Sequence, residues 1–280
     1  DEEHIAKEVR SNPYKVLITT LGRSFEFADR MIMELRPDLK VSEIRCAYLI
    51  LSVLERNETM EGDTKLDAND LYNYILEEYT QAKDLEPLIV PVVTNNNLFY
   101  YDEENKTVSI MTTYMAECRI ADFIVDKCKN STKLNIDYTK YNKIKDGTLT
   151  EEQQNILKTF CESNITIVNS KGGTGKSATT LALINMLEDN DMTYSLLTPT
   201  GRVAKALKIL TNGRPTSTIH KACLSNPDGM WSDVFIIEEG SMIGIDLMCM
   251  LINSIANKNA RIVINMDLGQ IAPISCGCPM

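Results

Sequence analysis

The sequence lacks the long apolar segments that would place it in or across a membrane. No apolar run approaches the roughly 18 residues that a transmembrane helix needs. The first residues, DEEHIAKEV, are charged and contain no apolar core of a secretory signal peptide. We therefore expect a cytoplasmic protein with no membrane partner. The chain also lacks an initial methionine, from which we expect a piece of a longer protein.

Paired metal-ligand patterns are also missing. The eight cysteines are scattered, none forms a C-x-x-C pair, and Cys276 and Cys278 have no second pair nearby. Histidine occurs only twice. This pattern predicts reduced cysteines that pack mostly in the core rather than disulfides or a cysteine-ligated metal.

Basic residues are in the minority, because 29 Lys and Arg stand against 39 Asp and Glu, for a net charge of −10. Such a charge opposes a polyanionic partner, so any contact with DNA must use a local basic face. A hydrophobic content of 44% and a charged content of 24% indicate a globular protein. The 280 residues are enough for two domains with separate cores.

The first half is predicted to be mainly helical. Two short helices in residues 12–34 flank the turn at 21–24, in a pattern that resembles a helix-hairpin-helix. Backbone N–H groups at Gly22 could contact a DNA phosphate there, although an ordinary helical hairpin explains the same pattern.

A winged-helix-like unit is predicted to follow. Periodicity indicates helices at 42–57, 67–82 and 113–129 and a hairpin at 97–110. Residues 130–147 are polar and Lys-rich, so we expect a linker that ends near Gly147. The expected domains are therefore 1–147 and 148–280.

The stretch Ile165–Ser177, ITIVNSKGGTGKS, organises the second half. An apolar strand enters a glycine-rich turn that ends in Gly175-Lys176-Ser177, and a helical pattern follows. Turn residues Gly172, Gly173 and Thr174 complete a loop whose amides could face an anion. Lys176 could then reach the β- and γ-phosphates of ATP, and the Ser177 hydroxyl could hold Mg²⁺.

Strands and helices alternate after residue 150, which predicts an α/β fold with a parallel sheet and helices on both faces. The predicted strands are 165–169, 194–198, 234–237 and 261–265, and the predicted helices are 151–162, 176–189, 201–210 and 244–258. Ligands of such a fold bind at the carboxyl ends of the strands. Polar motifs occupy several of these ends.

The strand at 234–237 ends in Glu238 and Glu239, a pair suited to hold Mg²⁺ and to activate a water. Gln153 opens the first helix, either as part of a capping box with Thr150 or as a reader of adenine. Further candidates follow later strands: Pro199, Thr200 and Arg202, then Thr218 and His220, and finally Gln270 as a sensor of the γ-phosphate.

Six motifs in order resemble those of RecD-like DNA helicases of superfamily 1. They are LTEEQQ (149–154), GGTGKS (172–177), TPTGRVAKAL (198–207), STIH (217–220), IIEEGSM (236–242) and DLGQIAP (267–273). The resemblance implies a RecA-like P-loop NTPase domain in an ATP-dependent motor that moves 5′ to 3′ on single-stranded DNA, with roles in repair or recombination.

The resemblance also implies a role for each matching residue. Lys176 would hold phosphates, Ser177 and Glu238 would hold Mg²⁺, and Glu239 would activate water. Gln153 would read adenine and Gln270 would sense the γ-phosphate. Pro199, Thr200, Thr218 and His220 would lie along the DNA. The family also uses a second motor domain with arginine fingers, which are worth about 10³–10⁵ in rate. The sequence stops soon after Gln270, so we expect slow hydrolysis by this chain alone.

Two other interpretations remain open. The sequence from Lys171 to Ser177 also fits the variant loop of ParA/MinD-type partitioning ATPases, in which the early lysine reaches a partner's ATP across a dimer. Ser170 and Glu238 depart from the helicase pattern, which has Gly and Asp there, so a nucleotide- or DNA-binding module without helicase activity is the second alternative. The sequence does not indicate an oligomeric state.

Overall fold

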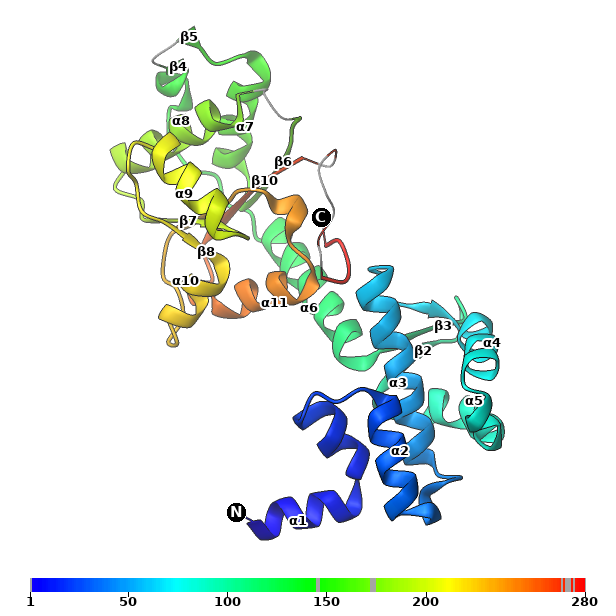
Figure 1. Cartoon of the computed structure of the whole chain (residues 1–280). Coiled ribbons are helices and arrows are strands. Elements are labelled where there is room, and N and C mark those ends of the chain that lie inside the picture. Colours follow the sequence, from blue (N-terminus) through cyan, green and yellow to red (C-terminus); the bar gives the residue numbers. More distant parts are fainter. Residues whose placement is uncertain are drawn as a thin grey trace. The chain divides into compact units, whose positions relative to one another are not determined.

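The structure is a computed structural model that describes residues 2–144, 147–171, 175–267, 269, 273 and 275–279. The chain divides into two compact units, Asp1–Met115 and Ala116–Met280 (Figure 1). Helix α6 (Met111–Lys129) contributes residues to both.

The first unit is mainly helical, with a small antiparallel sheet in the order β1-β3-β2. Its elements are α1 (Glu2–Ser11), the π-helix η1 (Lys15–Thr20), α2 (Phe25–Leu35), η2 (Pro37–Leu39), α3 (Glu43–Met60), β1 (Leu66–Asp67), α4 (Ala68–Glu78), η3 (Thr80–Leu85), α5 (Glu86–Asn95), β2 (Phe99–Asp102) and β3 (Thr107–Ile110). From α3 to β3 the order is helix, strand, two helices and a hairpin, so the predicted helices and hairpin are present, and the winged-helix-like character stays a prediction. Helix α5 was not predicted.

A buried polar cluster joins α2 and the residues before η1 to α3. Arg45 donates to both carboxylate oxygens of Asp29, at 2.7 and 2.8 Å, and both side chains are almost fully buried. The Tyr14 hydroxyl also donates to Asp29, and its ring stacks on Phe25 and Tyr48. A buried ion pair with this many hydrogen bonds fixes the position of α2 against α3.

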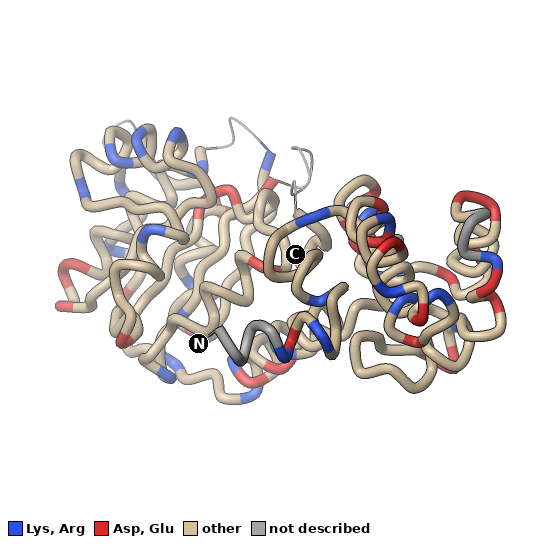
Figure 2. The backbone as a smooth tube through the Cα atoms, turned by 60° about the horizontal axis from the view of Figure 1, so that its bottom comes forward, with Lys and Arg blue, Asp and Glu red and all other residues tan. Residues whose placement is uncertain are grey.

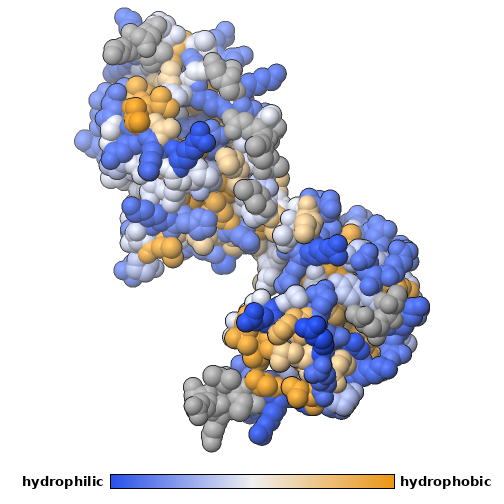
Figure 3. Space-filling model, viewed as in Figure 1, coloured by the Kyte–Doolittle hydropathy of each residue, from blue (hydrophilic) through white to orange (hydrophobic). Residues whose placement is uncertain are grey.

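Helices η1 and α2 flank an exposed turn, as the sequence predicts. Gly22 adopts a left-handed conformation there (φ +62°), and Ser24 caps α2 by accepting from the Phe27 N–H. Figure 3 shows apolar surface over the N-terminal helices. Leu21 in the turn and Phe27 in α2 both have exposed side chains.

The second unit contains a five-stranded parallel sheet in the order β6-β10-β9-β7-β8. Its strands are β6 (Ile165–Asn169), β7 (Tyr194–Thr198), β8 (Thr216–Thr218), β9 (Val234–Ile237) and β10 (Arg261–Met266), and its helices are α7 (Glu151–Glu162), α8 (Lys176–Asp189), α9 (Gly201–Leu210), α10 (Ile219–Ser225) and α11 (Ile245–Ser254). Short elements η4 (Tyr138–Tyr141), β4 (Lys143–Ile144), β5 (Gly147–Thr148) and η5 (Gly240–Met242) complete it. The predicted α/β fold is confirmed, whereas α10 and β8 were not predicted.

Alternate residues of the central strands build two cores, one on each face of the sheet. Ile262 and Ile264 pack with α10, α11 and the second half of α6, whereas Val263 packs with α7 and α8. β9 and β10 are buried at every residue, as expected for parallel strands covered on both faces.

The division between the units lies within α6, about 30 residues before the boundary near Gly147 that composition indicates. Ile120 and Phe123 of α6 pack against the sheet, and Lys127 donates to the carbonyls of Lys258 and Ala260 at 2.8 and 2.7 Å. Residues 130–144 also belong to the second unit. Their spaced apolar side chains, Leu134, Ile136, Tyr138 and Tyr141, pack on the core beside α7 and α8, so this polar stretch is not a detached linker.

Candidate functional site

The glycine-rich turn joins β6 to α8, as predicted, and its last residue is held in a conformation that requires glycine. Gly175 has φ +82°, and a Cβ there would lie 2.5 Å from Nε2 of Gln153. The positive φ disfavours any residue with a Cβ at the start of α8, and such a residue would also displace the Gln153 amide. Gly172, Gly173 and Thr174 lie outside the described residues.

Lys176 begins α8 at the carboxyl edge of the sheet. Its ammonium nitrogen lies 3.7 Å from Oδ2 of Asp267, which follows β10 and is almost fully buried. Lys176 is itself mostly buried, with a side chain 18% exposed. The charge is thus held at the mouth of the turn by a carboxylate to which sequence reasoning assigned no role.

Glu238 directly follows β9 and belongs to a buried network of three side chains. Its Oε1 accepts from the Thr180 hydroxyl at 2.6 Å and from Nδ2 of Asn265 at 2.8 Å, and Asn265 also donates to Thr180 at 3.2 Å. Burial raises the pKa of the Glu238 carboxyl, and these hydrogen bonds and the Lys176 charge oppose that shift. Sequence reasoning missed Thr180 and Asn265, although a polar residue in the otherwise apolar strand β10 is a signal that could have pointed to Asn265.

Glu239 adopts a left-handed backbone conformation (φ 57°), which is uncommon for a residue with a Cβ and costs on the order of 1–3 kcal/mol. Its Oε2 is buried and has no hydrogen-bond partner among the described residues. A strained residue with an unsatisfied carboxylate oxygen is the kind of group that a bound water or cation would satisfy.

These side chains meet at a cavity of about 560 Å³. Its lining includes Gly175, Lys176 and Ser177 at the start of α8, Glu238 and Glu239 after β9, and residues of α9, among them Arg202. Oε1 of Glu238 accepts the hydrogen bonds from Thr180 and Asn265. Glu238 also lines the cavity. The Ser177 hydroxyl and the two glutamates therefore provide the hard oxygen ligands that Mg²⁺ prefers, so the residues present fit this ion.

Gln153 forms the predicted capping box with Thr150 at the start of α7. Its Oε1 accepts from the Thr150 N–H at 2.9 Å, and its Nε2 donates to the carbonyl of Gly175 at 3.3 Å. The amide thus connects the cap of α7 to the glycine-rich turn. A second cavity of about 490 Å³ lies beside it, lined also by Ile156 and Lys171. Adenine recognition by Gln153 stays a prediction.

The candidate DNA-contacting residues of this unit lie at two neighbouring helix starts. Thr200 caps α9 and Thr218 caps α10, and the preceding strands β7 and β8 are paired so that Thr198 lies opposite Thr218. Pro199 is half-buried, whereas the side chains of Arg202 and His220 are exposed. Their proximity agrees with a common surface. Gln270 lies outside the described residues.

Gly22 belongs to the first unit, where it lies close in sequence to an exposed aromatic residue. The guanidinium groups of Arg23 and Arg30 each lie 5.8 Å from the centre of the Phe27 ring. Sequence reasoning did not single out Phe27, although it follows Gly22 by five residues.

The parallel sheet, the glycine-rich turn before α8 and the acidic end of β9 define a P-loop nucleotide-binding fold. Residues 148–280 match the family model of an AAA domain. The chain is 31% identical over 154 residues to an ATP-dependent RecD2 DNA helicase of Deinococcus radiodurans, an alignment that covers 52% of this chain and 21% of the helicase. These matches confirm the resemblance to RecD-like superfamily 1 helicases that the motifs indicate.

A second relative is the uncharacterized protein MJ1519 of Methanocaldococcus jannaschii, 26% identical over 178 residues, or 55% of this chain and 15% of that protein. The alignments thus span only about a fifth or less of each relative's length. Among solved structures, Bacteroides Pif1 bound to ssDNA is similar with a TM-score of 0.34 and 23% identity, over 45% of this chain and 33% of Pif1. Across the part of the chain that the structure describes, every helix is too short or too polar to cross a membrane.

Proposed function

We propose that this chain binds ATP with Mg²⁺ and single-stranded DNA and acts in a helicase that moves 5′ to 3′. The observation that supports this most is the convergence of Lys176, Ser177, Glu238 and Glu239 on one cavity at the carboxyl edge of the sheet. A phosphate-binding lysine beside two carboxylates is the arrangement that phosphoryl transfer from ATP requires.

Each residue has a role that follows from its position. Lys176 exchanges its contact with Asp267 for the β- and γ-phosphates, which carry more negative charge. Ser177 and Glu238 hold Mg²⁺, which neutralises charge on the phosphates. Glu239, with an unsatisfied oxygen, accepts a proton from the attacking water.

DNA would contact the starts of α9 and α10. Thr200 and Thr218 cap these helices, whose N-terminal N–H groups attract phosphates, and Arg202 adds an exposed positive charge. Gly22, with Arg23 and Phe27, is a second proposed contact, because an exposed ring with positive charge nearby can stack on a base. Gln270 remains the proposed sensor of the γ-phosphate and Gln153 the proposed reader of adenine.

Binding of a fluorescent ATP analogue with Mg²⁺ tests the nucleotide site. Lys176→Ala is expected to weaken binding at least about tenfold, since it removes the cation that the phosphates contact. Lys171→Ala is the matched control, because Lys171 lies in the same loop but is exposed. Equal binding by the Lys176→Ala variant and the unmodified chain would contradict the proposal.

The same pair of variants separates the alternative functions. In a ParA/MinD-type ATPase, Lys171→Ala would abolish ATP-driven dimerisation, whereas in a helicase it would not. In a binding module without motor activity, Lys176→Ala would leave single-stranded DNA binding unchanged both with and without ATP. The helicase proposal expects DNA affinity to change with nucleotide in the unmodified chain and not in the variant.

A further inference from the structure

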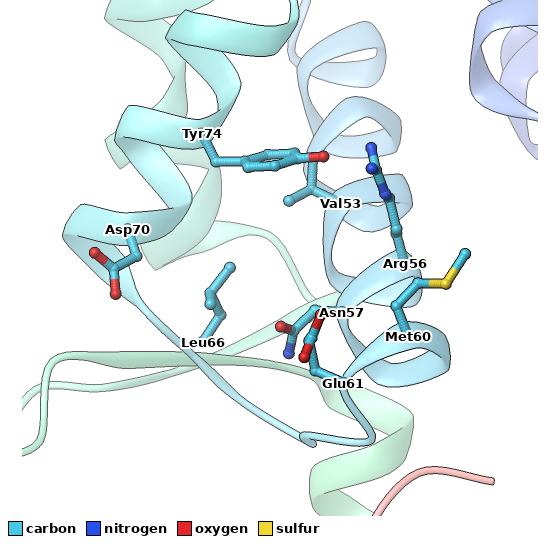
Figure 4. Close-up of a pocket in the computed structure, with 8 residues that line it drawn as sticks. All are labelled: Val53, Arg56, Asn57, Met60, Glu61, Leu66, Asp70 and Tyr74. Atoms are coloured by element: carbon cyan, nitrogen blue, oxygen red, sulfur yellow. The ribbon is translucent and has the colours of Figure 1, made fainter. Parts of the chain in front are cut away.

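A groove in the first unit lies between α3 and α4 and is independent of the nucleotide site. It has a volume of about 420 Å³. Figure 4 shows the Tyr74 ring of α4 facing Val53 and Arg56 of α3, with Leu66 of β1 below them. The groove is therefore mainly apolar in its interior, and it is formed by three elements of the winged-helix-like unit.

Carboxylates dominate the rim of this groove. Glu61 follows α3 and Asp70 lies in the first turn of α4, and both are exposed. Arg56 is the one basic residue of the described lining, and its guanidinium lies 5.6 Å from the centre of the Tyr74 ring. The connection between the helices contains Asp63, Lys65 and Asp67 and so adds one further net negative charge.

The negative charge extends over the whole unit. Residues 1–115 contain 22 acidic and 12 basic residues, a net charge of −10, whereas residues 116–280 contain 17 of each. The excess acid of the protein therefore belongs entirely to the first unit, whose acidic segments are red in Figure 2. Such a unit attracts positively charged partners and repels polyanions.

Helix α5 also argues against DNA as the partner of this part of the unit. It occupies the position of the third helix in the winged-helix-like order, yet its sequence, EPLIVPVVTN, contains no basic residue, and its single charge is Glu86. A helix that reads DNA normally carries basic and amide side chains. A protein segment fits the chemistry of this unit better than a nucleic acid does.

We propose that the groove binds an extended, basic segment of a partner protein. An apolar side chain of the segment fills the space between Val53, Leu66 and Tyr74, and neighbouring lysines or arginines face Glu61 and Asp70. The Tyr74 hydroxyl, which is buried and has no hydrogen-bond partner among the described residues, donates to a carbonyl of the segment. An apolar anchor within a charged rim is a common arrangement in peptide recognition.

The test uses the full chain and three fluorescent twelve-residue peptides that differ in one property each. One alternates Leu and Lys, one alternates Leu and Glu, and one alternates Ser and Lys. The Leu/Lys peptide is expected to bind at least about tenfold more tightly than either other peptide, because only it supplies both an anchor and positive charge. Equal binding of the Ser/Lys peptide, or no binding of the Leu/Lys peptide, overturns the proposal.

Charge reversal locates the site. The double variant Glu61→Lys/Asp70→Lys is expected to weaken Leu/Lys binding at least about tenfold. The matched control is Glu103→Lys/Glu104→Lys, in the exposed turn between β2 and β3, which changes the total charge equally and is expected to have less than about a twofold effect. Equal weakening by both variants would indicate that the peptide is attracted by the overall charge of the unit, and the assignment of its binding site to the groove would be overturned.

Direct binding of fluorescent oligo-dT of twelve nucleotides, measured without peptide, decides between protein and nucleic acid. If the Glu61→Lys/Asp70→Lys variant loses peptide binding and binds oligo-dT at least as tightly as the unmodified chain, the proposal stands, and if it keeps peptide binding or loses oligo-dT binding as well, the proposal fails. Circular dichroism of each variant checks that the helix content of the chain is unchanged. The ATP-analogue measurement is expected to be unchanged by all these variants, so the groove and the nucleotide site are tested separately.

Discussion

At the scale of single residues, the network of Glu238, Thr180 and Asn265 is the least expected feature of the site. A glutamate in place of the family's aspartate is longer by one methylene, and two donors from α8 and β10 hold one of its carboxylate oxygens. These two donors hold the longer side chain in one position. A glutamate free to rotate would be less preorganised to hold a metal ion.

Thr180→Val tests this role, because valine has the same shape without the hydroxyl donor. We expect binding of the ATP analogue with Mg²⁺ to weaken about tenfold, in the range typical of outer residues around a metal, with no change in EDTA. Thr180→Ser keeps the hydroxyl and is expected to resemble the unmodified chain. Equal losses in Mg²⁺ and in EDTA would instead indicate damage to α8.

At the scale of secondary-structure elements, an ion pair joins the end of α8 to the segment before β8. Arg214 donates to both carboxylate oxygens of Glu188 at 2.8 and 2.7 Å, and the Tyr194 hydroxyl donates to the same carboxylate at 2.7 Å. The hydrogen bonds from Arg214 lower the pKa of Glu188 to about 2. The ionised carboxylate thus links α8, β7 and β8 at this edge.

The lowered pKa predicts a pH-dependent contribution to stability. Because the folded-state pKa lies below the unfolded value of 4.5, the contribution is complete above pH 4.5 and is lost as the pH falls toward 2. Glu188 is 42% exposed, so solvent screening limits the contribution to about 1 kcal/mol. Urea unfolding of the unmodified chain and of Glu188→Gln should show a difference at pH 6 that disappears near pH 2. A difference independent of pH would contradict this prediction.

At the scale of the whole molecule, the separation of charge sets where a polyanion can bind. The second unit is neutral overall and carries Arg202 exposed at the start of α9, whereas the first unit has a charge of −10. We therefore expect single-stranded DNA to bind mainly through the second unit, with a local contact near Gly22, and to be repelled by the rest of the first unit.

Binding of oligo-dT at two salt concentrations tests this distribution. Affinity should fall as the salt concentration rises, because phosphate contacts release counterions. Arg202→Ala should weaken binding and reduce the slope of log affinity against log salt concentration by about one. Glu103→Lys/Glu104→Lys should tighten binding a few-fold at low salt only, since salt screens charges more than about 10 Å apart. Affinity that does not depend on salt would contradict the proposed DNA contacts.

Periodicity by itself determined most of the elements of the second unit. The helices at 151–162, 176–189 and 201–210 and the strands at 165–169 and 234–237 have the predicted bounds, because apolar spacing, caps and glycine act within a few residues. The short β8 and α10 escaped prediction, since three and seven residues give too little periodicity. The places of Lys176 at the start of α8 and of Glu238 after β9 were also predictable, because the P-loop imposes a fixed sequence order, whereas their chemical roles stay predictions.

Only the tertiary structure decided which distant residues share a site or a core. Asn265 and Thr180 are 85 residues apart, yet both contact Glu238, because parallel pairing brings β10 beside β9 and the fold places Thr180 of α8 within hydrogen-bond distance of the same carboxylate. Likewise, residues 130–144 look like a linker from their composition, and packing against α7 and α8 makes them part of the second unit. Composition measures the average polarity of a segment, whereas membership in a core depends on which few side chains meet an apolar surface.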